Sequence, residues 1–291
     1  MSPAVEIRLL VAREMRRSVR SVKGMALSAL TLIGAFVTSL VCVWIEGLNR
    51  AGVGATSTPA FVEMKRALIE KATGDASFAS YAASIPWSLI TFLKITLWFG
   101  PLLIALLGFD SVAGELQHRS IRYWALRSRR ASYFAAKVLG LWIMVGIITL
   151  AMNVLAAAVV LGRGYLTVGE LLGWGLRFWG VAFVIFGVWA ALATLVSSCF
   201  RSPMPALLST VALFFVIWLL GLGGLISRQA GASPEGGANK MVWYEYINPN
   251  SYDTLLLARD TTQVLAALGI LLAFIAVTIG TGALLLQRRD I

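Results

Sequence analysis

Apolar residues are grouped along this chain into six long runs that are separated by shorter polar segments. The runs occupy residues 25–45, 87–109, 138–161, 175–198, 206–226 and 263–286. An α-helix needs about 20 mostly apolar residues to cross the roughly 30 Å hydrocarbon core of a bilayer, and each run has them. The pattern therefore predicts an all-α polytopic membrane protein with six transmembrane helices and no soluble domain.

The segment before the first run is basic and amphipathic rather than uniformly apolar. Over residues 5–23, an apolar stripe recurs at helical spacing and arginines occupy the other side (Val11, Met15, Val19 and Val22; Arg13, Arg16, Arg17 and Arg20). Such a helix lies in the membrane interface. We expect residues 1–24 to form a cytoplasmic amphipathic elbow helix, or simply a topology signal, and residues 25–291 to form the six-span domain. The first span lacks a clear cleavage site and is interpreted as a retained signal anchor.

Composition supports a membrane protein, and the charge distribution predicts its orientation. The chain has 291 residues, of which 58% are hydrophobic and 13% charged, with a mean hydropathy of +0.80. A net charge of +11 would by itself allow nucleic-acid binding. With a cytoplasmic N-terminus, however, the inner segments hold 15 basic and five acidic residues, and the outer segments hold nine of each. Because loop Lys/Arg bias sets orientation, we expect both termini in the cytoplasm.

The location of the charge also predicts the surroundings of the protein. A basic inner surface would face the anionic lipids of the inner leaflet, so membrane lipids rather than nucleic acid are the expected partners. The predicted localisation is a bacterial-type inner membrane, that is, the plasma membrane. Two longer outer loops are expected over residues 46–86 and 227–261, and an inner loop over residues 110–137.

The sequence lacks the motifs that would favour an enzyme. It has no Gly-rich Lys-Ser/Thr phosphate loop, so nucleotide binding of that kind is not expected. No His/Glu/Cys group has metal-ligand spacing, and the single His118 cannot form a multi-histidine site. No Gly-x-Ser-x-Gly nucleophile turn occurs. We therefore predict no catalytic residues and no metal site in this chain.

The inner loop is the segment with the most distinctive residue order. Its marked positions are Phe109, Asp110, Gly114, Glu115, Leu126, Ser128, Arg129 and Lys137. In these positions the loop resembles the cytoplasmic loop of type-2 ABC exporter permeases, the ABC-2 family, whose six-span plan with inside termini also fits. The sequence departs from the family pattern at Arg119-Ser120, where Gly-Thr is usual, and at Arg130, where a proline is often found.

The resemblance implies a function and a set of partners. The loop would form a coupling helix seated in a cleft of a separate ATPase subunit, with docking residues Asp110, Gly114, Glu115, Arg119, Arg122 and Arg129. ATP and Mg²⁺ would be bound by that partner and no cofactor by this chain, which would pair with a second permease copy or a homologue. The chain would then be a permease that couples ATP hydrolysis to export, and not itself an enzyme.

Two alternatives stay open at this point. From the residues alone, the loop charges are equally well explained as solvated topology determinants, because an excess of inner Lys/Arg is routine. A non-transport membrane scaffold of an ABC-motor-driven envelope or motility complex is the alternative function.

Lys94 is the one charged residue placed well inside a predicted span. Thr91 lies three residues before it on a similar face, and Asn153 lies at comparable depth in the third span. Intramembrane charges usually face protein or water, so one interpretation is a translocation path lined by these three residues that meets an anionic substrate. At about 10 Å below the outer boundary, the favoured interpretation is a lysine that snorkels to the outer headgroups.

Overall fold

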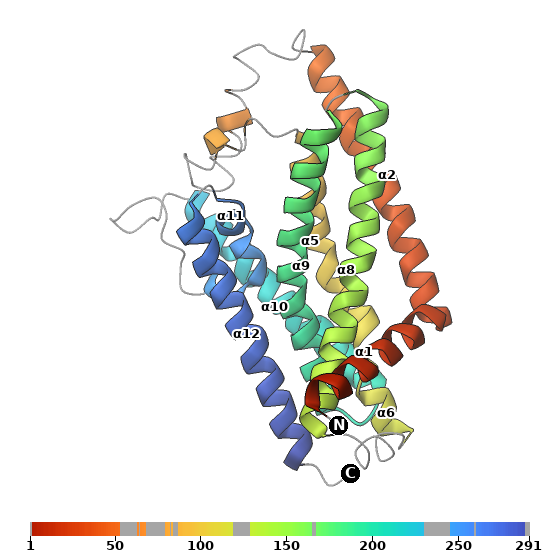
Figure 1. Cartoon of the computed structure of the whole chain (residues 1–291). Helices are drawn as coiled ribbons and strands as arrows, with labels where there is room; N and C mark the ends of the chain where they lie inside the picture. Colours follow the sequence, from red (N-terminus) through yellow and green to blue (C-terminus); the bar gives the residue numbers. More distant parts are fainter. Residues whose placement is uncertain are drawn as a thin grey trace.

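The described part of the chain forms a bundle of six long helices with shorter helices at its ends (Figure 1). The computed structural model describes residues 2–52, 63, 65–67, 79–81, 83, 87–118, 129–164, 167–229, 245–258 and 260–288. All regular structure in these residues is helical, and six helices are long and apolar enough to span a membrane, which confirms the predicted fold class. The six are α2 (Val22–Gly52), α5 (Trp87–Gly108), α8 (Arg130–Gly162), α9 (Val168–Cys199), α10 (Pro203–Gln229) and α12 (Thr261–Arg288).

Helix α9 forms the axis of the bundle. It packs against α5, α8, α10 and α12. In its most apolar stretch 67% of residues are buried, against 22% in α2, α10 and α12. Three of its large side chains, Phe178, Phe186 and Trp189, are almost completely enclosed. A helix that is hydrophobic all round and surrounded in this way belongs in the core, whereas the outer helices expose apolar faces.

The first helix, α1 (Pro3–Arg20), lies across one end of the bundle, and the N-terminus and the end of α12 lie at the same end (Figure 1). Leu10 is buried against the bundle, whereas Val19 and Val22 are 52% and 79% exposed. Residues Pro3–Arg20 of the expected amphipathic segment are helical, Val22 begins α2, and part of the apolar stripe faces outward. The position of α1 in a membrane interface stays a prediction.

Three helix boundaries differ by seven or more residues from those expected from hydropathy; one is the end of α2, which continues to Gly52, seven residues into the predicted outer loop 46–86. Helix α8 begins at Arg130, so the last eight residues assigned to the inner loop, 130–137, are helical. The hydropathy pattern excluded residues 130–137 from the predicted span because they include Arg130 and Lys137, but the Lys137 ammonium is paired and buried. Helix α9 likewise begins at Val168, seven residues before the predicted span.

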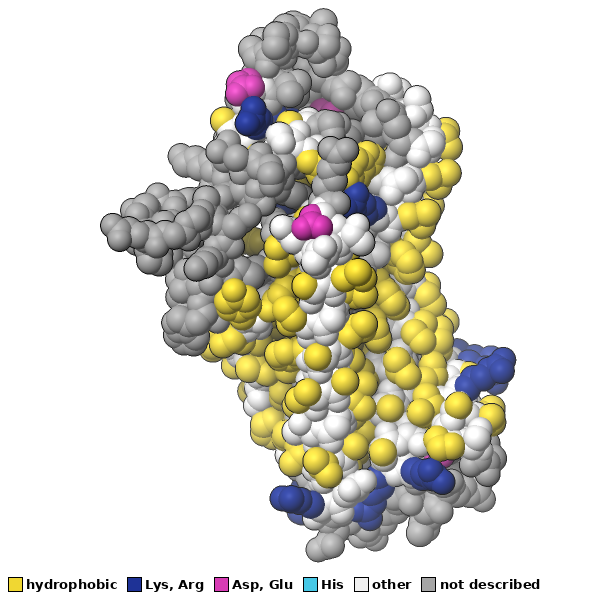
Figure 2. Space-filling model, turned by 60° about the vertical axis from the view of Figure 1, so that its left-hand side comes forward, with side chains coloured by type: hydrophobic (Ala, Val, Ile, Leu, Met, Phe, Trp, Pro, Cys, Tyr) yellow, Lys and Arg dark blue, Asp and Glu magenta, His cyan; other side chains and the backbone are white. Residues whose placement is uncertain are grey.

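The outer surface of the bundle is apolar around its middle. On the face drawn in Figure 2, hydrophobic side chains form a broad band, and Lys and Arg side chains gather toward its ends. Large apolar residues of α12 such as Leu265, Val277 and Leu284 are 57–68% exposed. An exposed apolar band of this size is suited to hydrocarbon rather than to water.

Candidate functional site

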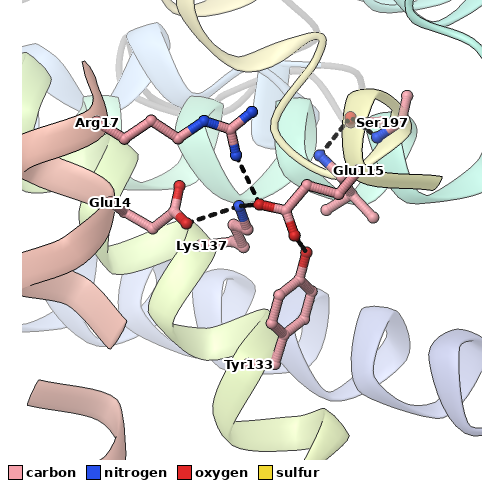
Figure 3. Close-up of polar contacts among 8 residues, drawn as sticks. Glu14, Arg17, Glu115, Tyr133, Lys137 and Ser197 are labelled. Atoms are coloured by element: carbon pink, nitrogen blue, oxygen red, sulfur yellow. Dashed lines mark hydrogen bonds and ion pairs between the residues drawn. The ribbon is translucent and has the colours of Figure 1, made fainter. Parts of the chain in front are cut away.

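Polar groups from five segments meet at the end of the bundle where α1 lies, and Figure 3 draws contacts from all of them except α2. The segments are α1, the start of α2, the short helix α6 (Ala113–Gln117) with the turn before it, the first turns of α8 and the last turn of α9. The turn and α6 are the start of the inner loop that resembles an ATPase-docking loop.

Glu115 on α6 lies at the centre of this group. Its side chain is 2% exposed and accepts three charge-assisted or neutral hydrogen bonds. The donors are the Arg17 guanidinium at 2.6 Å, the Lys137 ammonium at 2.7 Å and the Tyr133 hydroxyl at 2.7 Å. A buried carboxylate is stable only when it is paired and hydrogen-bonded, and these three donors meet that requirement.

Lys137 connects Glu115 to the elbow helix. Its ammonium, also 2% exposed, lies 2.7 Å from Glu115 and 2.8 Å from Glu14 of α1. The two carboxylates and the two cations, Lys137 and Arg17, balance each other. We call these four residues together with Tyr133 the ion-pair cluster. Breaking such a buried pair from one side is far more destabilising than removing a surface salt bridge.

The approach of α1 to α8 depends on a glycine. A Cβ atom at Gly140 of α8 would lie 2.9 Å from the Glu14 Cβ, closer than real Cβ contacts allow. The absence of a side chain at this position lets α1 lie directly against α8. Glu14 can then reach Lys137, which lies three residues earlier on α8.

The elbow between α1 and α2 is built by Ser21. Its extended backbone ends α1, its hydroxyl donates to the Ser18 carbonyl at 2.9 Å, and the same oxygen accepts from the Gly24 N–H at 2.9 Å. One serine thus satisfies free backbone groups of both helices, as capping residues do. The elbow fixes the angle at which α1 presents Glu14 and Arg17.

A second ion pair lies beside the cluster. Lys23 at the start of α2 contacts Asp110 at 2.7 Å and lies over the Phe109 ring, 3.9 Å from its centroid. The two charged side chains are 32% and 37% exposed. Solvent screens this pair, so it contributes less to the stability of the protein than the enclosed ion-pair cluster does.

Ser197 of α9 anchors α6 to the bundle axis. Its hydroxyl accepts from the backbone N–H groups of Val112 and Ala113, both at 3.1 Å, and donates to the Phe109 carbonyl at 2.7 Å. The first N–H groups of a helix have no partner within the helix. Here the Ser197 hydroxyl of α9 supplies the missing hydrogen-bond acceptor, so α6 is attached to α9 as well as to α1 and α8.

The structure brings three of the six predicted docking residues together. Asp110, Gly114 and Glu115 lie within this end of the bundle, with Glu115 enclosed rather than facing outward. Arg129 is exposed, and its backbone N–H donates to Glu6 of α1 at 2.7 Å. Arg119 and Arg122 lie outside the described residues. A contact of any of the six with an ATPase stays a prediction.

Sequence reasoning did not identify most members of the ion-pair cluster. Glu14 and Arg17 were seen only as part of an amphipathic helix, and Tyr133 was assigned to a loop. The available signal was their spacing, because Glu14 and Arg17 are three residues apart and share one helix face. Tyr133 and Lys137 are four apart and share another.

The predicted path residues are not joined to one another. The Lys94 ammonium forms an ion pair with Asp253 of α11 (Asp253–Leu257), whose carboxylate is 6% exposed. The Asn153 amide donates to the carbonyl of Thr149, one turn earlier in its own helix, at 2.8 Å. No hydrogen bond joins Lys94 to Thr91 or Asn153 within the described part of the chain. Their role in translocation stays a prediction.

The segment that carries Asp253 reaches deep between the helices. It contains η1 (Glu245–Ile247), η2 (Pro249–Tyr252) and α11, and most of its side chains are buried. The Asn250 amide donates to the Leu97 carbonyl at 2.9 Å and accepts from the Trp189 indole N–H at 3.0 Å. Leu97 lies ten residues into the 22-residue α5, so Asn250 sits about halfway along that helix.

The reason for this contact is Pro101. In an α-helix the carbonyl of residue 97 accepts from the N–H of residue 101, and proline has no N–H. The Leu97 carbonyl is therefore left without its helical partner in an apolar environment. Asn250 supplies the missing donor, which ties the 245–257 segment to the middle of α5.

Within the described residues, no group of three or more His, Cys, Asp and Glu side chains could hold a metal ion. The polar groups of the ion-pair cluster join α1, α6 and α8 through hydrogen bonds and ion pairs.

These features define a polytopic helical membrane protein in which one short loop helix is fastened to three long helices. The chain belongs to the ABC-2 family: the family described as ABC-2 family transporter protein matches residues 8–291. The match includes α1 from Arg8 onward, the inner loop and all six spans. Comparison with curated proteins gives no match. The family match therefore confirms the resemblance to the ABC-2 family that the inner loop indicated.

Proposed function

We propose that this chain is the transmembrane permease subunit of an ATP-driven exporter, working with a separate ATPase subunit that binds ATP and Mg²⁺. The chain itself supplies the path across the membrane and the mechanical connection, not the hydrolysis. A second copy or a homologous permease completes the complex in the plasma membrane. Membership of the ABC-2 family supports the permease assignment, and the ion-pair cluster supports the coupling role.

The observation that carries this proposal is the enclosure of Glu115. A loop helix that moved freely would absorb the motion of a docked motor. Here Glu115 is held by Lys137 and Tyr133 of α8 and by Arg17 of α1, and Ser197 holds the same helix to α9. Because packed elements move as units rather than deforming continuously, displacement of α6 would move these three helices together.

The charge at the end of the bundle that carries α6 supports an orientation of the chain in the membrane. The start of α1 and the end of α12 lie at the same end of the bundle as α6 (Figure 1), and the predicted inner segments hold 15 basic and five acidic residues. Such a bias supports a cytoplasmic location for this end. The ATPase would then meet the loop in the cytoplasm, where exposed basic groups such as Arg129 can pair with its acidic residues and fix the register of docking.

Purification from native membranes tests the proposal. We expect the tagged chain to retain a protein with a Gly-rich Lys-Ser/Thr phosphate loop, and the complex to hydrolyse ATP. Arg129→Glu should release the ATPase, because it reverses an exposed charge in the loop. The matched control is Arg201→Glu, which reverses an exposed arginine in the turn between α9 and α10, at the same end of the bundle. Recovery of the chain without any such ATPase would contradict the proposal.

A further inference from the structure

A polar pocket of about 170 Å³ lies at the elbow, between α1, the start of α2, the end of α5 and α8. The described residues that line it include three cations and two carboxylates: Arg17, Lys23, Lys137, Glu14 and Asp110. Both carboxylates and the enclosed Lys137 are engaged in the ion pairs described above. Arg17 and Lys23 are the cations that solvent reaches, with side chains 49% and 32% exposed. These two side chains therefore decide what the pocket can bind.

Arg17 and Lys23 retain hydrogen-bond donors that no described protein group uses. A guanidinium has five N–H donors, and within the described residues the Arg17 side chain donates only to Glu115, through Nη1. An ammonium has three, and in Lys23 the Asp110 carboxylate and the Leu107 carbonyl take two, at 2.7 and 3.4 Å. Arg17 and Lys23 also lie close enough for their like charges to act on each other. An anion between them would accept from the remaining donors and relieve the repulsion.

An apolar groove follows the pocket along the same two helices. On α2 the pocket ends at Gly24 and the groove begins one turn later, at Leu27. On α5 the groove ends at Leu106, next to Leu107 of the pocket. The groove has a volume of about 390 Å³, and the described residues that line it include no ionisable side chain. Pocket and groove thus lie end to end, an arrangement suited to a ligand with an anionic head and a hydrocarbon tail.

The length of the groove matches one leaflet of a bilayer. From Leu27 to Thr38 it extends over 11 residues of α2, about 16–17 Å at 1.5 Å per residue. Half of the roughly 30 Å hydrocarbon core is about 15 Å. The groove is open to the side, because Leu30 and Phe99 are 66% and 64% exposed and a Cβ atom at Gly34 would meet nothing within 4 Å. A lipid can therefore place an acyl chain in the groove while its phosphate lies at the elbow.

We propose that the elbow pocket binds the phosphate group of an anionic membrane lipid between Arg17 and Lys23, and that the groove between α2 and α5 holds one of its acyl chains. Basic pockets between helices at the cytoplasmic side of a membrane bind anionic headgroups in this way. A zwitterionic headgroup would bring its own cation against Arg17 and Lys23, so the site favours a lipid with a net negative headgroup. The proposal takes from the proposed function only the location of α1 at the inner face, and it needs no ATPase.

Native mass spectrometry of the purified full chain tests the site in the absence of the ATPase, so the result does not depend on the assignment as an exporter. The probes are palmitoyl-oleoyl-phosphatidylglycerol, which is anionic, phosphatidylcholine with the same acyl chains, and glycerol 3-phosphate, which has the phosphate but no chain. The expected result is one saturably bound phosphatidylglycerol per chain, at a concentration at which the other two probes do not bind.

Two sets of variants locate the bound lipid. Lys23→Met should raise the half-saturating phosphatidylglycerol concentration roughly 5-fold, the effect of one Lys or Arg near an anionic membrane surface, whereas Lys23→Arg should retain the affinity. Arg201→Met removes an exposed charge at the same end of the bundle, from a residue that does not line the pocket, and should leave binding unchanged. Gly34→Leu fills the groove and should weaken binding, whereas Gly280→Leu, at an open glycine on α12, should not.

Other outcomes would overturn the proposal. Equal binding of phosphatidylcholine and phosphatidylglycerol would mean annular lipid contact only. Equal binding of glycerol 3-phosphate would assign the pocket to a soluble phosphate compound instead of a lipid. A preference for phosphatidylglycerol that survives Lys23→Met would place the anion elsewhere on the basic end. Loss of a dimer, with lipid binding retained, in Gly34→Leu would show that a second copy covers the groove.

Discussion

Replacing Lys137 by methionine should destabilise the protein more than any other single charge removal at this end of the bundle. Methionine preserves much of the side-chain volume but leaves Glu14 and Glu115 facing each other with Arg17 as their remaining cation. Lys137 and Glu115 are each 2% exposed. Removing one partner from a pair buried to this extent costs about 3–5 kcal/mol.

The matched control is Lys23→Met, which breaks the neighbouring Lys23–Asp110 pair. Those two side chains are 32% and 37% exposed, so solvent screens them, and the expected cost is about 0–1 kcal/mol. The assay is the free energy of unfolding of the full chain in mixed micelles, followed by circular dichroism as the fraction of denaturing detergent is raised.

A second substitution tests the electrostatic reason for the effect. In Lys137→Met/Glu115→Gln one negative and one positive charge remain, Glu14 and Arg17, so the imbalance is removed. The double variant should recover at least about 1 kcal/mol relative to the sum of the single variants, as expected for residues in one network. A cost of Lys137→Met no larger than that of Lys23→Met, or additive costs of Lys137→Met and Glu115→Gln, would show that the buried charge balance does not stabilise this end of the bundle.

Two further predictions concern close contacts between helices. Asn250→Leu should lower the free energy of unfolding by about 2 kcal/mol or more, because it leaves the Leu97 carbonyl and the Trp189 indole N–H unpaired. In a Pro101→Ala background this loss should be smaller by about 1 kcal/mol, since the Leu97 carbonyl regains a helical donor. Equal losses in the two backgrounds of a double-mutant cycle would contradict this prediction. Gly140→Leu should displace α1 and increase amide hydrogen exchange in it, whereas Gly162→Leu, at an open site on the same helix, should not.

Hydropathy was sufficient to predict the spans because membrane helices must satisfy their backbone internally and cover themselves with apolar side chains. Both are local properties of about 20 residues. The elbow helix could be predicted for the same reason, since its apolar stripe is visible at helical spacing. The start of α8 could not, because hydropathy treats Lys137 as a loop residue, and only its pairing with Glu115 permits burial.

The site depends on contacts between residues that are distant in sequence. Glu115 is 98 residues from Arg17, and Asn250 is 153 residues from Leu97. The sequence does contain one signal for the second contact: Pro101 inside a span implies a carbonyl that needs an outside donor. It does not identify that donor. Lys94 was placed inside a span for the same local reason, and its partner Asp253 could not be predicted either.

We infer that movement of the docking loop reaches the rest of the bundle through Glu115. The measurement that tests this is the distance between two spin labels, one at Leu9 of α1 and one at Leu284 of α12, both 57% exposed. It is made by electron–electron double resonance on the complex with its ATPase, after replacement of Cys42 and Cys199 by alanine. ATP should shift the distance distribution in the otherwise unchanged protein, and Glu115→Gln should abolish the shift while the ATPase stays bound. An equal ATP-dependent shift with Glu115→Gln would show that the movement does not pass through Glu115.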